Sequence, residues 1–349
     1  MARRKPDLGE FHEITEAEDL REQLSRLHVQ LRKAKNRNEA LVEATIQGAH
    51  DAIMALGPIP PVPEPKPTGK GRPEVAIWHL TDWQGSKVTT SYNTKVMQKR
   101  IRLYCDKAIR LTEIQRADHP VNECVILFGG DLIEGLFNYP SQPFEIDASL
   151  FDQFTASAAL AADVVRRALA TYPKVRVIGE WGNHGRVGSK RAAVPRADNV
   201  DRMVYRLARA ILSDPETEQL HPRLTWTDSE EDIHHFTIGN YPALLIHGDE
   251  IGRNGASSIN TLVKYVTQLK AGAYEKPILD VYAGHLHSHR DIELPDGGCY
   301  YQTGSPETDN RYARDSMAAT STPSQRLHFV NPRRGRVTAQ YRVDLRDSD

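Results

Sequence analysis

The chain has 349 residues, enough for one large domain with an appendage. Its 45 Lys and Arg residues nearly balance 46 Asp and Glu residues, so any binding site for a polyanion has to be local. No stretch approaches the roughly 18 continuous apolar residues of a membrane span. Three cysteines, Cys105, Cys124 and Cys299, lack the paired spacing of a disulfide framework or zinc site. We therefore expect a soluble cytoplasmic protein without membrane contact.

Residues 1–56 predict an N-terminal α-helix. Thr15 and Glu18 have the spacing at which a hydroxyl and a carboxylate satisfy free backbone amides reciprocally at a helix start. An apolar seam then recurs at alternating spacings of four and three, formed by Leu20, Leu24, Leu27, Leu31, Ala34, Asn38 and Leu41. The seam favours a coiled coil that joins two copies of the chain as a homodimer. It decays after Leu41, so docking onto the chain's own domain and a solvated arm remain alternatives.

Residues 57–73 predict a linker, because seven prolines and three glycines there remove backbone donors and restrict φ. Residues 74–349 then form the main domain. Strand-like runs alternate with helical patterns in its first half, at 75–81, 95–116, 124–128, 149–172, 175–178 and 198–212. Strands dominate its second half, at 224–227, 235–238, 243–246, 279–283, 299–303, 326–330 and 337–343. This order predicts an α/β fold of two packed mixed β-sheets flanked by helices.

Polar side chains follow five of the predicted strands. Alone, each is commonly a turn residue or a hydrogen-bonded core histidine. Because α/β folds gather reactive side chains at strand ends, we expect these residues to converge. Their oxygen and nitrogen donors suit divalent cations. The residues are Asp82, Asp131, Asn183 with His184, His247, and His285 with His287.

These residues resemble the calcineurin-like metallophosphoesterase family, whose pattern runs Asp-x-His, Gly-Asp-x-x-Asp/Glu, Gly-Asn-His-Asp/Glu, a lone His and Gly-His-x-His. The second to fifth motifs match at 130–134, 182–184, His247 and 284–287. In the first motif Gln84 replaces the usual histidine, and in the third Gly185 replaces the closing acid. The resemblance covers the chain from about Val75 onward. It implies a four-layer sandwich of two sheets and flanking helices.

The resemblance also implies two divalent metal ions, with Mn expected and Mg, Fe, Zn and Ni as alternatives. One ion would be held by Asp82, Gln84, Asp131 and His287, and the other by Asp131, Asn183, His247 and His285, so that Asp131 bridges them. Two such ions activate a shared water and neutralise phosphate charge. His184, Asp131 and Asn183 would form the catalytic set. We expect His184 to act as a general acid or transition-state donor, with simple positioning of Asn183 and the phosphate as the alternative.

Substrate choice has to come from loops, because the metal cluster does not select among phosphoesters. Cations near the motifs are candidates for phosphate contacts: Lys87, Arg186, Lys190 and Arg191. Aromatic side chains near the motifs are candidates for stacking on unpaired bases, unless they belong to the core: Trp83, Phe137, Tyr139 and Trp181. The segment 331–336 offers further cations or forms a basic hairpin turn.

We favour a DNA exonuclease or endonuclease that resembles the DNA-repair exonucleases of the family, with single strands or duplex ends as its DNA partner. The first alternative is a phosphodiesterase or phosphatase for small, including cyclic, nucleotides, with the loop 304–323 as a lid. The second is an inactive binding or scaffolding module, since Gln84 weakens the metal site.

Overall fold

The computed structural model describes residues 62–65, 71–188, 198–214, 217, 219–228, 233–251, 259–310 and 322–346. All of them belong to one compact unit, Pro60–Asp349. The predicted helix of residues 1–56, most of the linker, Lys190 and Arg191, and most of the loop 304–323 lie outside the described residues. The coiled coil and the homodimer therefore stay predictions. Across the described ranges, no helix combines the length and the apolar character that a membrane crossing requires.

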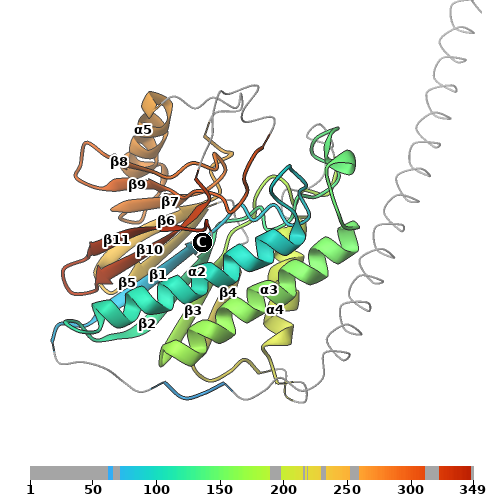
Figure 1. Ribbon diagram of the computed structural model, residues 1–349. Coiled ribbons are helices and arrows are strands. Elements are labelled where there is room, and N and C mark those ends of the chain that lie inside the picture. The colour runs from blue at the N-terminus through green and yellow to red at the C-terminus, as the bar shows by residue number, and fades with distance from the viewer. Residues whose placement is uncertain are drawn as a thin grey trace, which may run out of the picture. The chain divides into compact units, whose positions relative to one another are not determined.

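The first sheet has six strands in the order β11-β10-β1-β2-β3-β4. β1 to β4 run parallel, whereas β10 pairs antiparallel with β1 and with β11. The strands are β1 (Glu74–Leu80), β2 (Val121–Phe128), β3 (Lys174–Gly179), β4 (Leu224–Asp228), β10 (Ser324–Asn331) and β11 (Arg336–Asp344). Its outer face is covered by the helices α2 (Thr94–Gln115), α3 (Leu150–Thr171) and α4 (Val200–Ile211) (Figure 1).

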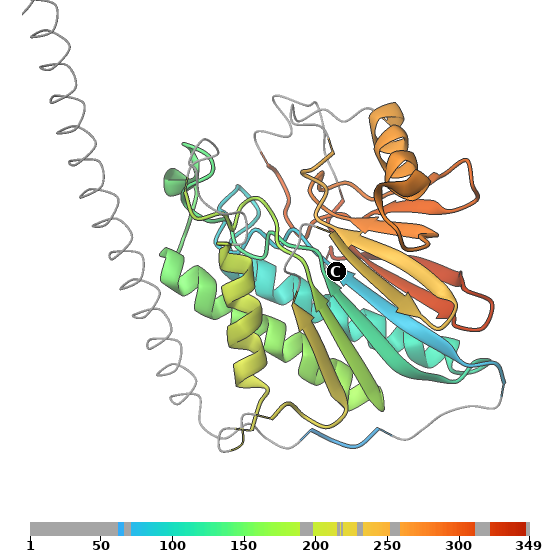
Figure 2. The ribbon, with the colours of Figure 1, turned by 180° about the vertical axis from the view of Figure 1, so that it is seen from behind.

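The second sheet has five strands in the order β5-β6-β7-β9-β8. They are β5 (Ile233–Ile238), β6 (Tyr241–Ile246), β7 (Asp280–Ala283), β8 (Arg290–Glu293) and β9 (Cys299–Gln302). The helix α5 (Ile259–Gln268), continued by a π-helical turn at Leu269–Ala273, lies on its outer face (Figure 2). Helices, sheet, sheet and helix thus form four layers, which confirms the predicted fold class.

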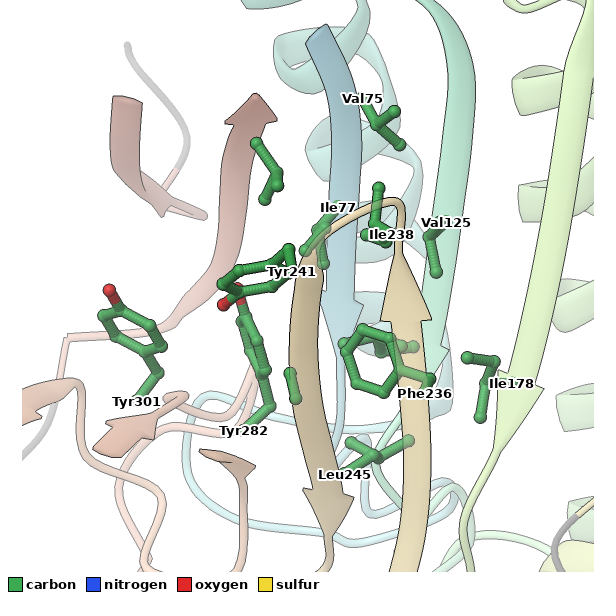
Figure 3. Close-up of a cluster of buried hydrophobic side chains, with 13 residues drawn as sticks. Val75, Ile77, Val125, Ile178, Phe236, Ile238, Tyr241, Leu245, Tyr282 and Tyr301 are labelled. Atoms are coloured by element: carbon green, nitrogen blue, oxygen red, sulfur yellow. The ribbon is translucent and has the colours of Figure 1, made fainter. Parts of the chain in front are cut away.

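Successive side chains along a strand point to opposite faces of its sheet, so each strand contributes both to the core between the sheets and to the contact with the helices. On β1, Val75 and Ile77 enter the core between the sheets, whereas Trp78 contacts Tyr104 of α2 and Tyr172, the residue that ends α3. The core between the sheets is built from Val75, Ile77, Val125, Leu127, Ile178, Phe236, Ile238, Tyr241, Ala243, Leu245, Tyr282, Tyr301 and Val330 (Figure 3). A second core packs α5 on β6, β7 and β9.

The helix starts follow from capping residues. Asn93, Ser149 and Asn199 each accept a backbone amide at the start of α2, α3 and α4. Such caps contribute about 1 kcal/mol each. The predicted strands and these three helices are present, with ends shifted by a few residues. Neither α5 nor β8 was predicted from the sequence. The sequence also did not indicate which sheet each later strand joins, and β4, β10 and β11 belong to the first sheet.

A chain of buried polar groups crosses the space between the sheets. Arg326 donates to His328 Nε2 over 2.9 Å, and His328 Nδ1 lies 3.1 Å from the hydroxyl of Tyr282. The Tyr282 hydroxyl in turn lies 3.0 Å from that of Tyr241, which donates to Asp280 over 2.6 Å. Burial, together with the charge of Arg326, holds the pKa of His328 well below its usual range. His328 is therefore neutral in the folded protein.

Folding stability should decrease as the pH falls below about 6.5, because the unfolded chain binds a proton on His328 that the folded protein does not. The variant His328→Gln keeps one donor and one acceptor but does not titrate. Its loss of unfolding free energy between pH 7 and pH 5.5 should be smaller than that of the wild type, by up to about 1.4 kcal/mol per pH unit. Urea denaturation at the two pH values measures this. Equal losses in the two proteins would contradict the assignment.

Candidate metal centre

The predicted site residues follow the carboxyl ends of parallel strands in both sheets. β1, β2 and β3 supply those of the first sheet, and β6 and β7 those of the second. Contacts between side chains show that the loops after these strands meet at one place. The converging residues are Asp82, Gln84, Asp131, Asn183, His184, His247, His285 and His287. The expected convergence of the motifs is thus present in the structure.

One group of donors surrounds Asp131. One ligand atom from each of Asp131, His247 and His285 lies within 4.8 Å of the others, close enough to hold a single ion. His247 Nε2 lies 3.1 Å from Asp131 Oδ2 and 3.1 Å from Asn183 Oδ1. Asp131, His247 and Asn183 are buried. The group matches the second ligand set that the family resemblance implies.

The other group contains Asp82, Gln84 and His287. His287 Nε2 lies 3.4 Å from Asp82 Oδ1 and 3.2 Å from Gln84 Nε2, and Gln84 Nε2 lies 3.4 Å from Asp131 Oδ2. The oxygen Oε1 of Gln84 is buried and has no hydrogen-bond partner among the described residues. A buried carbonyl oxygen without a partner is unfavourable, so it is available to a cation. The donors of both groups therefore fit divalent cations, with Asp131 in contact with each.

The backbone of this site is unusual. Five of the seven predicted ligands have positive φ, from 47° to 66°: Asp82, Gln84, Asp131, His285 and His287. Residues other than glycine rarely adopt this left-handed conformation, which costs about 1 to 2 kcal/mol each. Backbone hydrogen bonds hold it in place, because Asp82 N donates to Gly130 O over 2.9 Å and Gln84 N to Asp131 O over 3.0 Å. The loops after β1 and β2 thereby fix each other.

Asp201, which the sequence analysis missed, holds two of the ligand loops together. Its carboxylate is buried in the first turn of α4. It accepts the backbone amides of Asp131 over 2.8 Å, Leu132 over 3.0 Å and Gly182 over 2.9 Å. Burial and the nearby Asp131 raise the pKa of Asp201 to about 6. No motif pointed to Asp201, because an acidic residue at a helix start is common.

Two of the candidate histidines have partners on their outer nitrogens. His247 Nδ1 lies 2.7 Å from Gly129 O, and His287 Nδ1 lies 2.9 Å from Glu307 Oε2. Such contacts orient the ring so that Nε2 faces the site, the usual arrangement of metal-binding histidines. Glu307 is buried and was also missed by the sequence analysis. Glu307 belongs to no motif, so the sequence alone does not identify it as a partner of His287. Only the fold places the loop after β9 beside that histidine.

The histidines share a crowded set of charges. Burial lowers the pKa of His184, but Asp131 and Glu134 outweigh it and raise this pKa to about 9. At His287, the hydrogen bonds that the ring donates to the carboxylates of Asp82 and Glu307 outweigh burial in the same way and raise the pKa to about 10. A cation bound among these groups would compete with their protons.

His184 is held by the segment that follows β2. Its Nδ1 lies 3.0 Å from Glu134 O and 3.1 Å from Gln142 Nε2, and its backbone amide donates to Asp131 Oδ1 over 2.7 Å. Its Nε2 lies 4.0 Å from Asp131 Oδ2. The ring of Tyr139 lies 5.3 Å from the His184 ring. His184 therefore presents Nε2 toward the carboxylate of Asp131, and its expected role as a proton donor stays a prediction.

The residues predicted to bind substrate lie in varied surroundings. Lys87 Nζ forms ion pairs with Glu134 over 3.1 Å and Glu145 over 2.6 Å, and Arg186 pairs with Asp249. These cations are engaged within the protein, and their role toward phosphate stays a prediction.

The predicted stacking residues divide into two kinds. Trp83 and Trp181 are core residues, at 0% and 4% exposure, so they offer no face to a base. Phe137 and Tyr139 are exposed. The predicted stacking function is thus open only to the latter two.

The basic segment 331–336 is the turn of the β10–β11 hairpin. Val330 pairs with Val75, at the start of β1, whereas Asp82 follows the end of β1. At about 3.3 Å per residue the turn lies roughly 20 Å from Asp82. The turn therefore lies at the end of the strands opposite to the metal centre.

Comparisons with known proteins give resemblances to solved structures alone. No family model matches the sequence, and no curated protein matches it. Among solved structures, Vps29 from Entamoeba histolytica in complex with zinc is 13% identical with a TM-score of 0.36, covering 78% of this chain and 99% of that chain. A metallophosphoesterase from Sphaerobacter thermophilus is 13% identical with a TM-score of 0.30, covering 78% and 89%. The 5'-nucleotidase of Candida albicans is 12% identical with a TM-score of 0.33, covering 81% and 54%. Resemblances this low transfer no activity to the present chain.

Gln84 should set the metal preference of its group, because an amide oxygen binds softer cations less well than an imidazole does. The variant Gln84→His should bind Zn more tightly relative to Mn, by on the order of tenfold. Histidine tolerates the left-handed backbone at this position better than most residues. Calorimetric titration of metal-stripped protein with each cation measures the preference, with Gln340→His on the exposed β11 as a control. An unchanged preference would remove Gln84 from the ligand set.

Proposed function

We propose that this chain is a metal-dependent phosphoesterase that hydrolyses phosphodiester bonds with two divalent cations. The observation that carries the proposal is the convergence of two donor groups on Asp131. Asp131 Oδ2 lies 3.1 Å from His247 Nε2 and 3.4 Å from the amide nitrogen Nε2 of Gln84. Such a pair of cations supplies a hydroxide nucleophile near neutral pH and neutralises charge on the phosphate. The unpartnered oxygen of Gln84 supports the same reading.

In this proposal each side chain has a defined part. Asp82, Gln84 and His287 hold one cation, Asn183, His247 and His285 hold the other, and Asp131 is shared. His184 donates a proton to the leaving oxygen from Nε2, since its Nδ1 is occupied by Glu134 O and Gln142. The backbone amide of His184 holds Asp131 in place by donating to its Oδ1 over 2.7 Å.

The finer proposal is that the substrate is DNA, cut as single strands or at duplex ends by a nuclease of the DNA-repair type, with Mn as the preferred metal. The support is Tyr139, whose exposed ring lies against His184 and offers a face on which a base can stack. A small-nucleotide phosphodiesterase would share this feature, and the experiment below separates the two.

The test is a parallel assay of purified, metal-stripped protein to which Mn, Mg, Zn, Ni or Fe is returned. The substrates are bis(p-nitrophenyl) phosphate, single-stranded DNA, duplex DNA with blunt ends and a cyclic nucleotide. We expect aryl diester and single-stranded DNA cleavage that needs a divalent cation and falls as salt rises, because DNA contacts are salt-dependent. Cleavage of the cyclic nucleotide alone would replace the nuclease proposal. Failure of every substrate with every metal would defeat the phosphoesterase proposal.

A further inference from the structure

Residues 303–310, which follow β9, lie against one of the two groups of metal-binding candidates. Ser305 and Glu307 of this segment are buried, at 0% and 3% exposure. The hydroxyl of Ser305 donates to the backbone carbonyl of Asp82 over 2.7 Å and accepts the backbone amide of Glu307 over 2.9 Å. The carboxylate of Glu307 lies 2.9 Å from His287 Nδ1. The segment therefore contacts two members of the first donor group, which consists of Asp82, Gln84 and His287.

The position of Glu307 is fixed on both sides along the chain. Arg100 of α2 donates from Nη1 to the backbone carbonyl of Pro306 over 2.6 Å and to Thr308 Oγ1 over 3.0 Å. The side-chain amide of Asn310 donates to both carboxylate oxygens of Glu307, over 2.9 and 3.1 Å. The fold itself thus holds this carboxylate beside the histidine. A partner that is already in place orients a metal-binding ring at little further cost in entropy.

The two donor groups differ in the partner of one histidine. The second donor group consists of Asn183, His247 and His285. His247 Nδ1 lies 2.7 Å from the neutral backbone carbonyl of Gly129, whereas His287 Nδ1 faces a carboxylate. A carboxylate that accepts the Nδ1 proton leaves Nε2 free for a cation and makes it a stronger donor. Its negative charge also attracts the cation directly. The first donor group gains both effects from Glu307, and the carbonyl of Gly129 supplies no charge to the second.

We propose that Glu307 is a positioning residue that sets the cation affinity of the first donor group through His287. Its carboxylate contacts Nδ1 of the ring, whereas Nε2 faces Asp82, so Glu307 acts through the histidine and not as a ligand. The inference rests on the proposed binding of two cations and adds the residue that makes their two sites unequal. Removal of the Glu307 charge should therefore weaken the binding of one cation and spare the other.

The test is calorimetric titration of metal-stripped protein with Mn²⁺, which gives a dissociation constant for each site. The variant Glu307→Gln keeps the length of the side chain and one acceptor oxygen for Nδ1 but removes the charge. We expect the wild type to bind two Mn²⁺ ions per chain. In Glu307→Gln one dissociation constant should rise by about 10- to 100-fold, the usual effect of losing a partner of a metal-binding histidine, and the other should stay unchanged.

A measurement on the ring itself separates positioning from a general effect of charge. In protein saturated with diamagnetic Zn²⁺, ¹⁵N chemical shifts of the histidine rings report where the proton lies and how strongly it is hydrogen-bonded. The Nδ1 signal of His287, assigned as the one lost in His287→Gln, should shift in Glu307→Gln. The Nδ1 signal of His247 should not, because its carbonyl partner is unchanged. Equal shifts of the two signals would overturn the action through His287.

Asp118→Asn is the matched control. Asp118 Oδ2 lies 3.2 Å from His119 Nε2, in the same kind of carboxylate–histidine contact, but this carboxylate is 89% exposed and belongs to neither donor group. The control should keep both dissociation constants. Circular dichroism melting in EDTA shows whether each variant is folded. If Glu307→Gln does not fold, Arg100→Ala gives a second reading, because it frees the residues on both sides of Glu307 from α2 and should raise the same constant by about fivefold.

The outcomes separate this inference from the proposed function. Two unchanged constants in Glu307→Gln, or an equal rise of both, would overturn the inference and leave the phosphoesterase proposal standing. A loss of affinity of the same size in the Asp118 control would do the same. A wild type that binds no divalent cation would overturn both.

Discussion

Asp131→Asn should reduce kcat for an aryl phosphodiester by about a thousandfold or more. Asp131 contacts both donor groups, so the loss of its charge weakens two cation sites together. A cation contributes several kcal/mol to charge stabilisation in phosphoryl transfer, and each 1.4 kcal/mol corresponds to a factor of ten. The amide has nearly the shape of the carboxylate, so the loss should come from charge rather than packing.

Metal content measured by mass spectrometry should fall in step with activity in this variant. Asp118→Asn is a suitable control, because the Asp118 side chain is 89% exposed and belongs to neither donor group. It should keep both metal and turnover. Full activity in Asp131→Asn would show that the shared position of Asp131 has no catalytic consequence.

Asp201→Ala should lower the free energy of unfolding by about 3 kcal/mol or more. The carboxylate accepts three backbone amides, from Asp131, Leu132 and Gly182. Without it these buried donors lose their partner, and each unsatisfied donor costs about 1 to 3 kcal/mol. Asp201→Asn retains one acceptor oxygen and should be less destabilised than the alanine variant.

Urea denaturation measures both variants. Asp152→Ala is the matched control, since Asp152 also occupies a helix first turn but is exposed. Its effect combines the interaction of an exposed acid with the helix dipole, about 0.3 to 1 kcal/mol, and the hydrogen bond that Asp152 accepts from Ser149 Oγ over 2.6 Å. Equal destabilisation of the Asp152 and Asp201 variants would show that Asp201 acts as an ordinary helix-start residue.

The sequence predicted the strand and helix order well, for local reasons. Apolar runs such as 125–128 are strands buried on both faces, and capping residues such as Ser149 mark helix starts. By contrast, local sequence patterns did not indicate which sheet each strand joins. β10 lies antiparallel beside β1 although about 250 residues separate them, and no periodicity encodes such a pairing. For the same reason the sequence left open whether the segment 331–336 supplies cations to the site or forms a hairpin turn, and the structure shows the turn.

The candidate ligands were found because they sit in short motifs, whereas the residues that position them were not. Asp201, Gln142 and Glu307 are single polar residues outside any motif, and their contacts depend on how three loops meet. The left-handed backbone at Asp131 and His285 was equally hidden, since that conformation usually predicts glycine or asparagine. Tertiary contacts impose it.

The donor groups draw on both sheets, with Asp82, Asp131 and Asn183 after strands of the first and His247, His285 and His287 after strands of the second. A cation bound by both sets of ligands would cross-link the two sheets. A displacement of one sheet relative to the other would change the lengths of its coordination bonds. The absorption spectrum or the magnetic properties of bound Co²⁺ would therefore report such a displacement. If the chain were divided between β4 and β5, each fragment would carry only part of the ligand set. Metal binding by a mixture of the two fragments would then show that they had reassembled.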